Sequence, residues 1–89
     1  MTTVGFRPPI TVFLAHPDTT IRQSINDEVA GTGITIVGES DNGDDALEKM
    51  LELAPDVALI AVDPALDGLS VCAALRATLP VCRALLLAG

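Results

Sequence analysis

The sequence predicts an α/β domain built as a three-layer open parallel sheet, with one layer of strands between two layers of helices. Short apolar runs of strand length alternate along the chain with segments in which apolar residues recur every three or four positions. The connections between these segments are only a few residues long. Strands that alternate with helices in this way are typical of parallel βαβ units with right-handed crossovers.

The first strand is expected over residues 10–15 (ITVFLA), a continuous apolar run that suits a strand buried on both faces. Asp18 is placed to cap the following helix, because its carboxylate can accept hydrogen bonds from backbone N–H groups two or three residues ahead. Apolar residues at intervals of four predict that helix over residues 19–30. Gly31 then ends it, since glycine tolerates a positive φ.

The second strand is expected over residues 34–37 and is followed by polar turn residues, 38–43. Two aspartates open the second predicted helix, residues 44–54, where the helix dipole favours negative charge. We expect Pro55 to stop this helix, because the residue before a proline is biased away from helical geometry.

The third strand, residues 57–62 (VALIAV), is the most uniformly apolar run in the chain. A loop over residues 63–68 leads to a third helix, residues 69–79, which has apolar residues at helical spacing. Pro80 closes this helix, and residues 81–88 (VCRALLLA) are expected to form a fourth strand. In open sheets of this kind the functional site lies beyond the carboxyl ends of the strands.

The chain has 89 residues and a net charge of −7, with only five Lys and Arg residues. A phosphate backbone requires cations opposite it, so we do not expect this segment itself to bind nucleic acid. No apolar run is long enough to cross a bilayer, and residues 1–9 are expected to form a flexible leader without the apolar core of a signal peptide. We therefore expect a cytoplasmic domain without membrane contact.

In the cytoplasm Cys72 and Cys82 would stay reduced, and we expect both to act as small core residues.

Three segments, "ITVFLAHPDTTIRQSI", "ITIVGESDNGDDALEKMLELAPDVALIAV" and "LDGLSVCAALRA", resemble consecutive parts of response regulator receiver domains of the NarL/FixJ type. The similarity runs from Ile10 to Gly89, and "IVGESDNGDDALE" and "PDVALI" are its most characteristic pieces. It implies a CheY-like, flavodoxin-like fold with strand order 2-1-3-4, in which the family's fifth strand is missing. Residues 10–89 are thus expected to form a partial receiver domain of a two-component system.

In that family two adjacent carboxylates follow the first strand, a phosphoacceptor Asp ends the third strand, and Thr or Ser ends the fourth. The acceptor attacks a phosphoryl group while Mg²⁺ neutralises the developing charge. Residue by residue, the acidic pair falls on His16 and Pro17, the acceptor on Ala61 and the hydroxyl on Ala88. None of these side chains can fill the family's role. We therefore predict a degenerate phosphorylation site without a metal, and Mg²⁺ binding is not expected.

Two alternatives stay open. Asp63, two residues beyond Ala61, is an alternative phosphoacceptor, with Asp18 as an alternative metal ligand. In the second alternative, a small molecule binds in the crevice at the ends of the strands. Without the acidic side chains, this crevice is more apolar than the family's phosphorylation site. His16 is the chain's only histidine, and a polar strand-end residue explains it without a metal. No enzyme is predicted, because the sequence has neither a nucleotide-binding glycine motif nor a Ser-His-Asp set.

The leading interpretation is a phosphorylation-independent receiver, a pseudo-receiver, that acts through dimerisation or protein contacts. The resemblance implies a C-terminal DNA-binding domain outside these residues and leaves open whether a sensor kinase acts on the chain. With the fifth strand absent, the fourth strand becomes an apolar edge and one sheet face is partly bare. Such edges pair with other strands, so we expect a homodimer or self-association through the fourth strand and that face.

Overall fold

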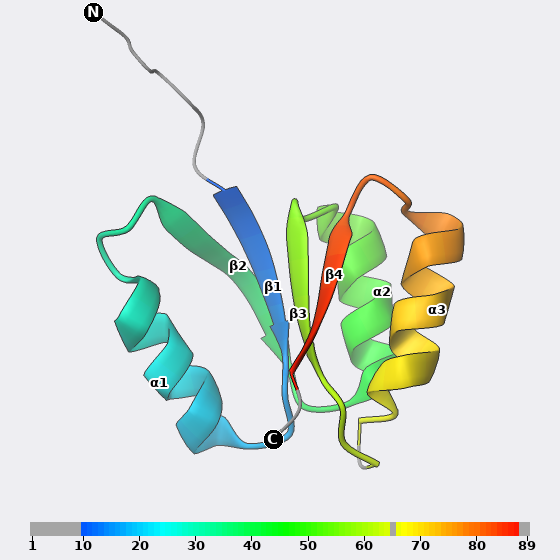
Figure 1. The fold of residues 1–89 in the computed structure, drawn as a ribbon, viewed down its shortest axis with the longest axis horizontal. Helices are drawn as coiled ribbons and strands as arrows, with labels where there is room; N and C mark the ends of the chain where they lie inside the picture. The colour runs from blue at the N-terminus through cyan, green and yellow to red at the C-terminus, as the bar shows by residue number, and fades with distance from the viewer. Residues whose placement is uncertain (1–9, 65, 88–89) are drawn as a thin grey trace, which may run out of the picture.

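The computed structural model describes residues 10–64 and 66–87, which form one parallel sheet with helices on both faces (Figure 1). The strands lie in the order β2-β1-β3-β4, so the predicted α/β class and strand order are confirmed. The elements are β1 (Ile10–Ala15), α1 (Thr19–Val29), β2 (Ile34–Ser40), α2 (Gly43–Leu53), β3 (Val57–Ala61), α3 (Gly68–Thr78) and β4 (Arg83–Leu87). The leader predicted over residues 1–9 and the predicted site residue Ala88 lie outside the described residues.

The larger part of the core lies between the sheet and the pair of helices α2 and α3, whereas α1 packs against β2 on the other face (Figure 1). Successive residues of β1 point to opposite faces. Phe13 and Ala15 belong to the α2–α3 core, and the buried Val12 and Leu14 point to the side of α1. The largest fully buried side chains are Phe13, Leu14, Met50, Ile60, Leu66 and Leu75.

β2 continues to Ser40, so the prediction that residues 38–40 form a turn was wrong. The register between β1 and β2 shifts after Val12, and Phe13 then pairs with Gly38. A Cβ atom at position 38 would lie 2.7 Å from Cε2 of Phe13, so glycine makes room for the aromatic ring against the strand. Pairing with β1 thus overrides the turn preference of this segment.

β1 and the starts of α1, β2 and β3 agree with the predictions, and the remaining boundaries, apart from the end of β2, differ by one or two residues. β4 begins at Arg83 rather than Val81, because the Cys82 N–H donates to the Leu79 carbonyl oxygen (3.1 Å) in a turn that leaves Val81 exposed. β3 ends one residue before its predicted end, α1 also ends one residue early, and α2 and α3 each begin and end one residue early. Each helix in the described part of the chain has 11 residues, and none has the length and apolar content needed to cross a bilayer.

Side-chain caps fix the starts of α1 and α2. Asp18 Oδ1 accepts a hydrogen bond from the Thr20 N–H at 2.8 Å, which confirms the predicted cap of α1. Gly31 follows that helix with a φ of 78°, also as predicted. The cap of α2 was not predicted: Asn42 Oδ1 accepts from the Asp45 N–H at 2.8 Å. The turns at the starts of both helices are therefore held by side chains.

The two cysteines are free thiols that serve as small apolar residues, as expected. Cys82 is buried in the α2–α3 core, and Cys72 packs half-buried against it. Burial, and secondarily the negative charge of Asp56, raises the pKa of the Cys82 thiol. Cys82 is therefore kept in its neutral form.

α3 begins directly against the end of β3, and Gly68 allows this approach. A Cβ atom built on Gly68 would lie 2.1 Å from the carbonyl oxygen of Ala61 and 3.1 Å from Cγ2 of Ile60. The first contact is with backbone, which cannot move without displacing the strand. Gly68 thereby fixes the position of the last residue of β3 relative to α3.

We expect Gly68→Ala to lower the free energy of unfolding by about 2–3 kcal/mol, because the added methyl group overlaps a backbone oxygen. Gly33→Ala is the control: its φ is 88°, but nothing lies within 4 Å of the added Cβ. Strain alone should cost that variant about 1 kcal/mol. Chemical denaturation followed by circular dichroism measures both, and equal losses would contradict the close approach at Gly68.

Candidate functional site

An open cavity of about 670 Å³ lies at the carboxyl ends of β1, β3 and β4. This edge of the sheet is where the strand order of an open parallel sheet places a functional site. Apolar lining comes from Ile21 of α1, Val62 and Leu87. The cavity is therefore formed by the turns that follow β1 and β3 together with the end of β4.

The structure brings together the site residues predicted from the sequence, except Ala88, which lies outside the described residues. His16, Pro17 and Asp18 line the cavity from the turn after β1. Ala61 and Asp63 line it from the end of β3 and the turn beyond. Their proximity follows from the parallel pairing of β1 with β3, in which Ala15 pairs with Ile60. The roles assigned to these residues stay predictions.

Ala61 is the last residue of β3 and has 2% of its surface exposed. Its side chain is a methyl group, which neither accepts a phosphoryl group nor binds a metal. Its carbonyl oxygen is covered by Gly68 at the start of α3. The strand end that is central to the cavity therefore offers no nucleophile.

Asp63 lies beyond β3, in the turn that leads to α3. Its backbone carbonyl oxygen accepts hydrogen bonds from the N–H groups of Leu66 (3.0 Å) and Asp67 (2.8 Å). Asp67 has a φ of 56°, in the left-handed region, and directly precedes Gly68. Asp63 thus reaches the cavity from a turn whose backbone is tied to the start of α3.

The polar groups of the turn after β1 are largely engaged within the turn itself. The Asp18 carboxylate caps α1 through the Thr20 N–H. The Asp18 N–H donates in turn to Nδ1 of His16 at 3.0 Å. Both side chains thus have structural partners at the mouth of the cavity, consistent with a polar strand-end role for His16.

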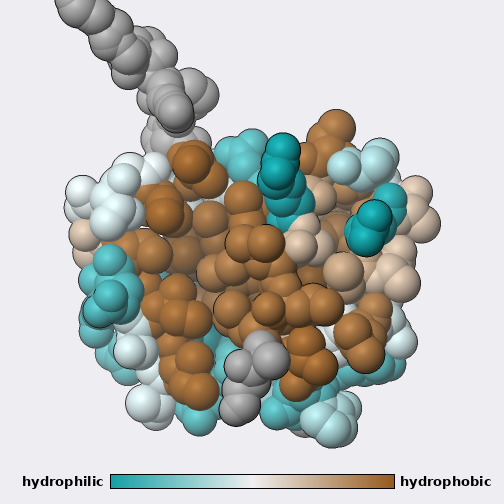
Figure 2. Space-filling view, in the orientation of Figure 1, coloured by the Kyte–Doolittle hydropathy of each residue, from teal (hydrophilic) through white to brown (hydrophobic). Residues whose placement is uncertain are grey.

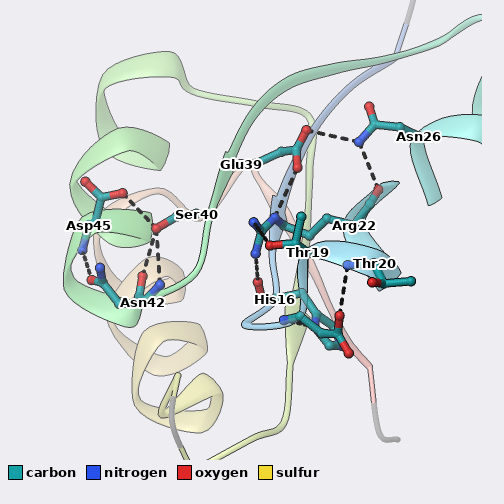
Figure 3. A network of polar contacts seen from close by, with 10 residues as sticks. His16, Thr19, Thr20, Arg22, Asn26, Glu39, Ser40, Asn42 and Asp45 are labelled. Atoms are coloured by element: carbon teal, nitrogen blue, oxygen red, sulfur yellow. Dashed lines mark hydrogen bonds and ion pairs between the residues drawn. The ribbon is translucent and has the colours of Figure 1, made fainter. Parts of the chain in front are cut away.

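A network of polar contacts centred on Arg22 holds the turn after β1 in place (Figure 3). The Arg22 guanidinium donates to the His16 carbonyl oxygen and to Thr19 Oγ1, and it forms a salt bridge with Glu39 of β2 (3.2 Å). Asn26 Nδ2 donates to the other Glu39 carboxylate oxygen at 3.0 Å. Arg22 was not among the residues predicted from the sequence. Its spacing of four from Asn26, which places both residues on one side of α1, was the available signal.

A second network lies at the end of β2, on the α2 side (Figure 3). The Ser40 hydroxyl is 2.7 Å from Asp45 Oδ2, and Lys49 forms a salt bridge with the same carboxylate oxygen (3.2 Å). The hydrogen bond from Ser40, and then that from Lys49, lowers the pKa of Asp45. None of these residues lines the cavity, so we assign them a structural role at the start of α2.

The cavity lacks part of the carboxylate set that the receiver resemblance implies for Mg²⁺. Mg²⁺ requires oxygen ligands converging in near-octahedral geometry. Pro17 and Ala61 have no ligand atom in their side chains. The carboxylates that line the cavity are Asp18, whose Oδ1 caps α1, and Asp63. Within residues 10–64 and 66–87, no group of three or more His, Cys, Asp or Glu side chains could hold a metal ion.

No protein-family model matches the sequence. Among curated proteins, a protein-glutamate methylesterase/protein-glutamine glutaminase of Syntrophomonas wolfei is 38% identical over 65 residues, 71% of this chain and 18% of that protein. A Pseudomonas aeruginosa protein named as a transcriptional regulator is 47% identical over 45 residues, 49% of this chain and 22% of that protein. The chain thus spans about a fifth of the length of the curated relatives it matches.

Solved structures of receiver domains match nearly the whole chain. The signal receiver domain of NarL from Mycobacterium tuberculosis is 30% identical with a TM-score of 0.84, over 92% of this chain and 68% of that one. The receiver domain of AraT from Geobacillus stearothermophilus is 27% identical with a TM-score of 0.82, over 91% and 65%. Fold, strand order and sequence agree, so the chain belongs to the response regulator receiver family of two-component systems.

Proposed function

We propose that this chain is a phosphorylation-independent receiver, which regulates its output through dimerisation or protein contacts. The observation that carries the proposal is Ala61, the buried last residue of β3, at the position where the family resemblance requires the phosphoacceptor carboxylate. The chemistry needs a nucleophilic oxygen there and a metal to offset the developing charge. A methyl group supplies neither the nucleophile nor a ligand.

Three further features support the proposal. Pro17 occupies a position where the family resemblance places a metal-binding carboxylate, and His16, at the adjacent position of that pair, has no oxygen in its side chain. Arg22 holds the turn after β1 through its contacts to the His16 carbonyl oxygen and to Glu39. The backbone that shapes the site is therefore retained while its reactive groups are replaced. No enzymatic step is assigned to the chain.

The competing interpretation uses Asp63 as the phosphoacceptor and Asp18 as a metal ligand. Both residues line the cavity, so their position alone does not exclude it. Two observations weigh against it. Asp63 lies outside β3 in a turn, and the Asp18 carboxylate is engaged as a helix cap.

Incubation with acetyl phosphate and Mg²⁺, followed by intact-mass measurement, tests the proposal. We expect no gain of a phosphoryl group, because no acceptor carboxylate stands at the end of β3. A receiver with an intact acceptor serves as the positive control for the phosphodonor. A gain in the native chain that Asp63→Asn abolishes and Asp44→Asn retains would overturn the proposal in favour of Asp63.

The output is proposed from the family and from composition. The five Lys and Arg residues and the charge of −7 do not suit this segment to contact DNA. We therefore assign DNA binding to a C-terminal domain outside these residues, consistent with the P. aeruginosa relative named as a transcriptional regulator. Within the cytoplasm, the receiver would control that domain by changing its association state.

A second candidate function is favoured by the cavity itself. Its volume of about 670 Å³ lies within the range of small-molecule sites, and Ile21, Val62 and Leu87 contribute apolar lining. A regulatory metabolite with an apolar body would fit this cavity, which under the proposal above is not used for phosphorylation.

Thermal denaturation in the presence of a metabolite library tests this second function. A ligand of the cavity should raise Tm of the native chain and should fail to raise Tm of Val62→Glu, which places a charge in the apolar lining. Leu51→Glu is the matched control, because Leu51 is similarly exposed on α2 and does not line the cavity. Equal stabilisation of both variants would exclude this cavity as the binding site.

A further inference from the structure

Two apolar surfaces of the molecule stand out, and only one of them is formed entirely by described elements. Figure 2 shows a broad apolar field over the middle of the molecule, between α1 and α3. The receiver family has a fifth strand beyond β4, and this chain covers only 68% of the NarL domain, so we assign no partner to that field. The second surface lies between α2 and α3, which Figure 1 shows side by side on one face of the sheet.

A groove with an apolar base runs between α2 and α3. A cavity of about 450 Å³ lies between the N-terminal halves of the two helices. The buried Leu66 and Val71 line it, together with the half-buried Leu47 and Ala74. Both helices and the turn before α3 therefore contribute apolar side chains to one depression.

The shape of this groove is fixed by a close contact at the start of α2. A Cβ atom built on Gly43 would overlap the carbonyl oxygen of Leu66 and lie 2.9 Å from Cγ2 of Val71. The first residue of α2 thus lies directly against the residues that lead into α3. Because the groove is held by backbone contact, a partner loses little free energy in ordering it.

The two walls of the groove continue along the helices. On α2, Leu51 lies four residues beyond Leu47 and therefore on the same side, and 42% of its surface is exposed. On α3, the small residues Ser70, Ala74 and Ala77 follow one another at spacings of four and three. Small side chains at a contact let two helices approach closely. We call the surface formed by these five residues the α2–α3 groove.

The rim of the α2–α3 groove is acidic. Asp44 and Asp67 line the cavity, and Glu48 lies one turn beyond Asp44 on α2. Within residues 10–64 and 66–87, no salt bridge or hydrogen bond involves these three carboxylates. Lys49 lies on the β2 side of α2, where it pairs with Asp45. No Lys or Arg side chain lines the cavity, so its negative charge is not offset there.

We propose that the α2–α3 groove binds a basic amphipathic helix of a partner protein. The inference rests on the proposed function, for which it specifies the kind of protein contact. Helix-in-groove recognition uses apolar side chains at spacings of three and four on one side of the bound helix. In this complex those side chains enter between Leu51 and Ala74. The flanking Lys and Arg side chains of the partner lie beside Asp44 and Asp67.

Charge favours this occupant over the others. A second copy of the chain would bring a net charge of −7 and the same acidic rim toward Asp44 and Asp67. A nucleic acid would bring phosphates to the same carboxylates. A basic helix meets both carboxylates with opposite charge, and its apolar side covers the base of the groove.

An NMR titration of the isotope-labelled 89-residue chain tests the proposal. The probe is a synthetic helical peptide of about 14 residues, or about four turns, made of Leu on one side and Lys on the other. The control peptide has Glu in place of every Lys. We expect the Lys peptide to shift the amide signals of the residues that form the α2–α3 groove, and the Glu peptide to leave them unchanged.

Two pairs of charge-removing substitutions test the acidic rim. Asp44→Asn combined with Asp67→Asn should raise Kd for the Lys peptide about fivefold, because two exposed ion pairs are lost. Asp27→Asn combined with Glu28→Gln removes the same charge from α1, on the other face of the sheet. That control should leave Kd within about twofold of native. Circular dichroism confirms that each variant is folded.

Neighbouring alanines of α3 test the base of the groove. Ala74→Gln should raise Kd about tenfold, because the longer side chain occupies the space that the partner's apolar residues enter. Ala73→Gln is the matched control, since Ala73 is exposed on the same helix and does not line the cavity. It should leave Kd within about twofold of native.

Absence of binding by the Lys peptide would overturn the inference, as would amide shifts confined to other surfaces or an equal effect of the two charge-removing pairs. Groove signals that shift with the concentration of the chain alone would assign the groove to a second copy and would also overturn it. The intact-mass measurement decides phosphorylation independence separately, so a failure of the proposed function is distinguished from a failure of the peptide to bind.

Discussion

The parallel pairing of β1 with β3 is the interaction on which the remaining structure depends. Its register places Phe13 beside Ala58 and Ala15 beside Ile60, and these four side chains belong to one core cluster. Because side chains alternate along a strand, a slip of one residue would move them all to the other face. The same register brings the turns after the two strands together around the cavity. Core packing and the geometry of the site are therefore set by one alignment.

The shape of the strand-end site depends on a glycine and on a helix cap. Gly68 allows α3 to approach the end of β3, and Asp18 caps α1. Ala61 and Pro17, by contrast, present no reactive or metal-binding group to the cavity. The backbone geometry of the site is thus held by a glycine and a helix cap, and it does not require a reactive side chain at Ala61 or Pro17.

Continuous apolar runs made the fold predictable, since residues 10–15 and 57–62 contain the two central strands of the sheet, whose side chains are mostly buried or half-buried. The positions of Ala61 and Asp63 followed, because parallel strands end at one edge. The extension of β2 and the Arg22 network did not follow. Gly38 lies in the sheet opposite Phe13, whose ring packs against it, and Arg22 contacts Glu39, which is 17 residues away in the sequence. Both depend on tertiary neighbours that local patterns do not contain.

The Arg22 network also bears on conformational entropy. Arg22 ties the turn after β1 to α1 and, through Glu39, to β2, with its side chain only 15% exposed. The entropy of ordering this turn is lost when the chain folds, so a later binding event has little disorder there to remove. A signal that passes through this turn would then shift α1, β1 and β2 against one another, because the turn itself is already ordered.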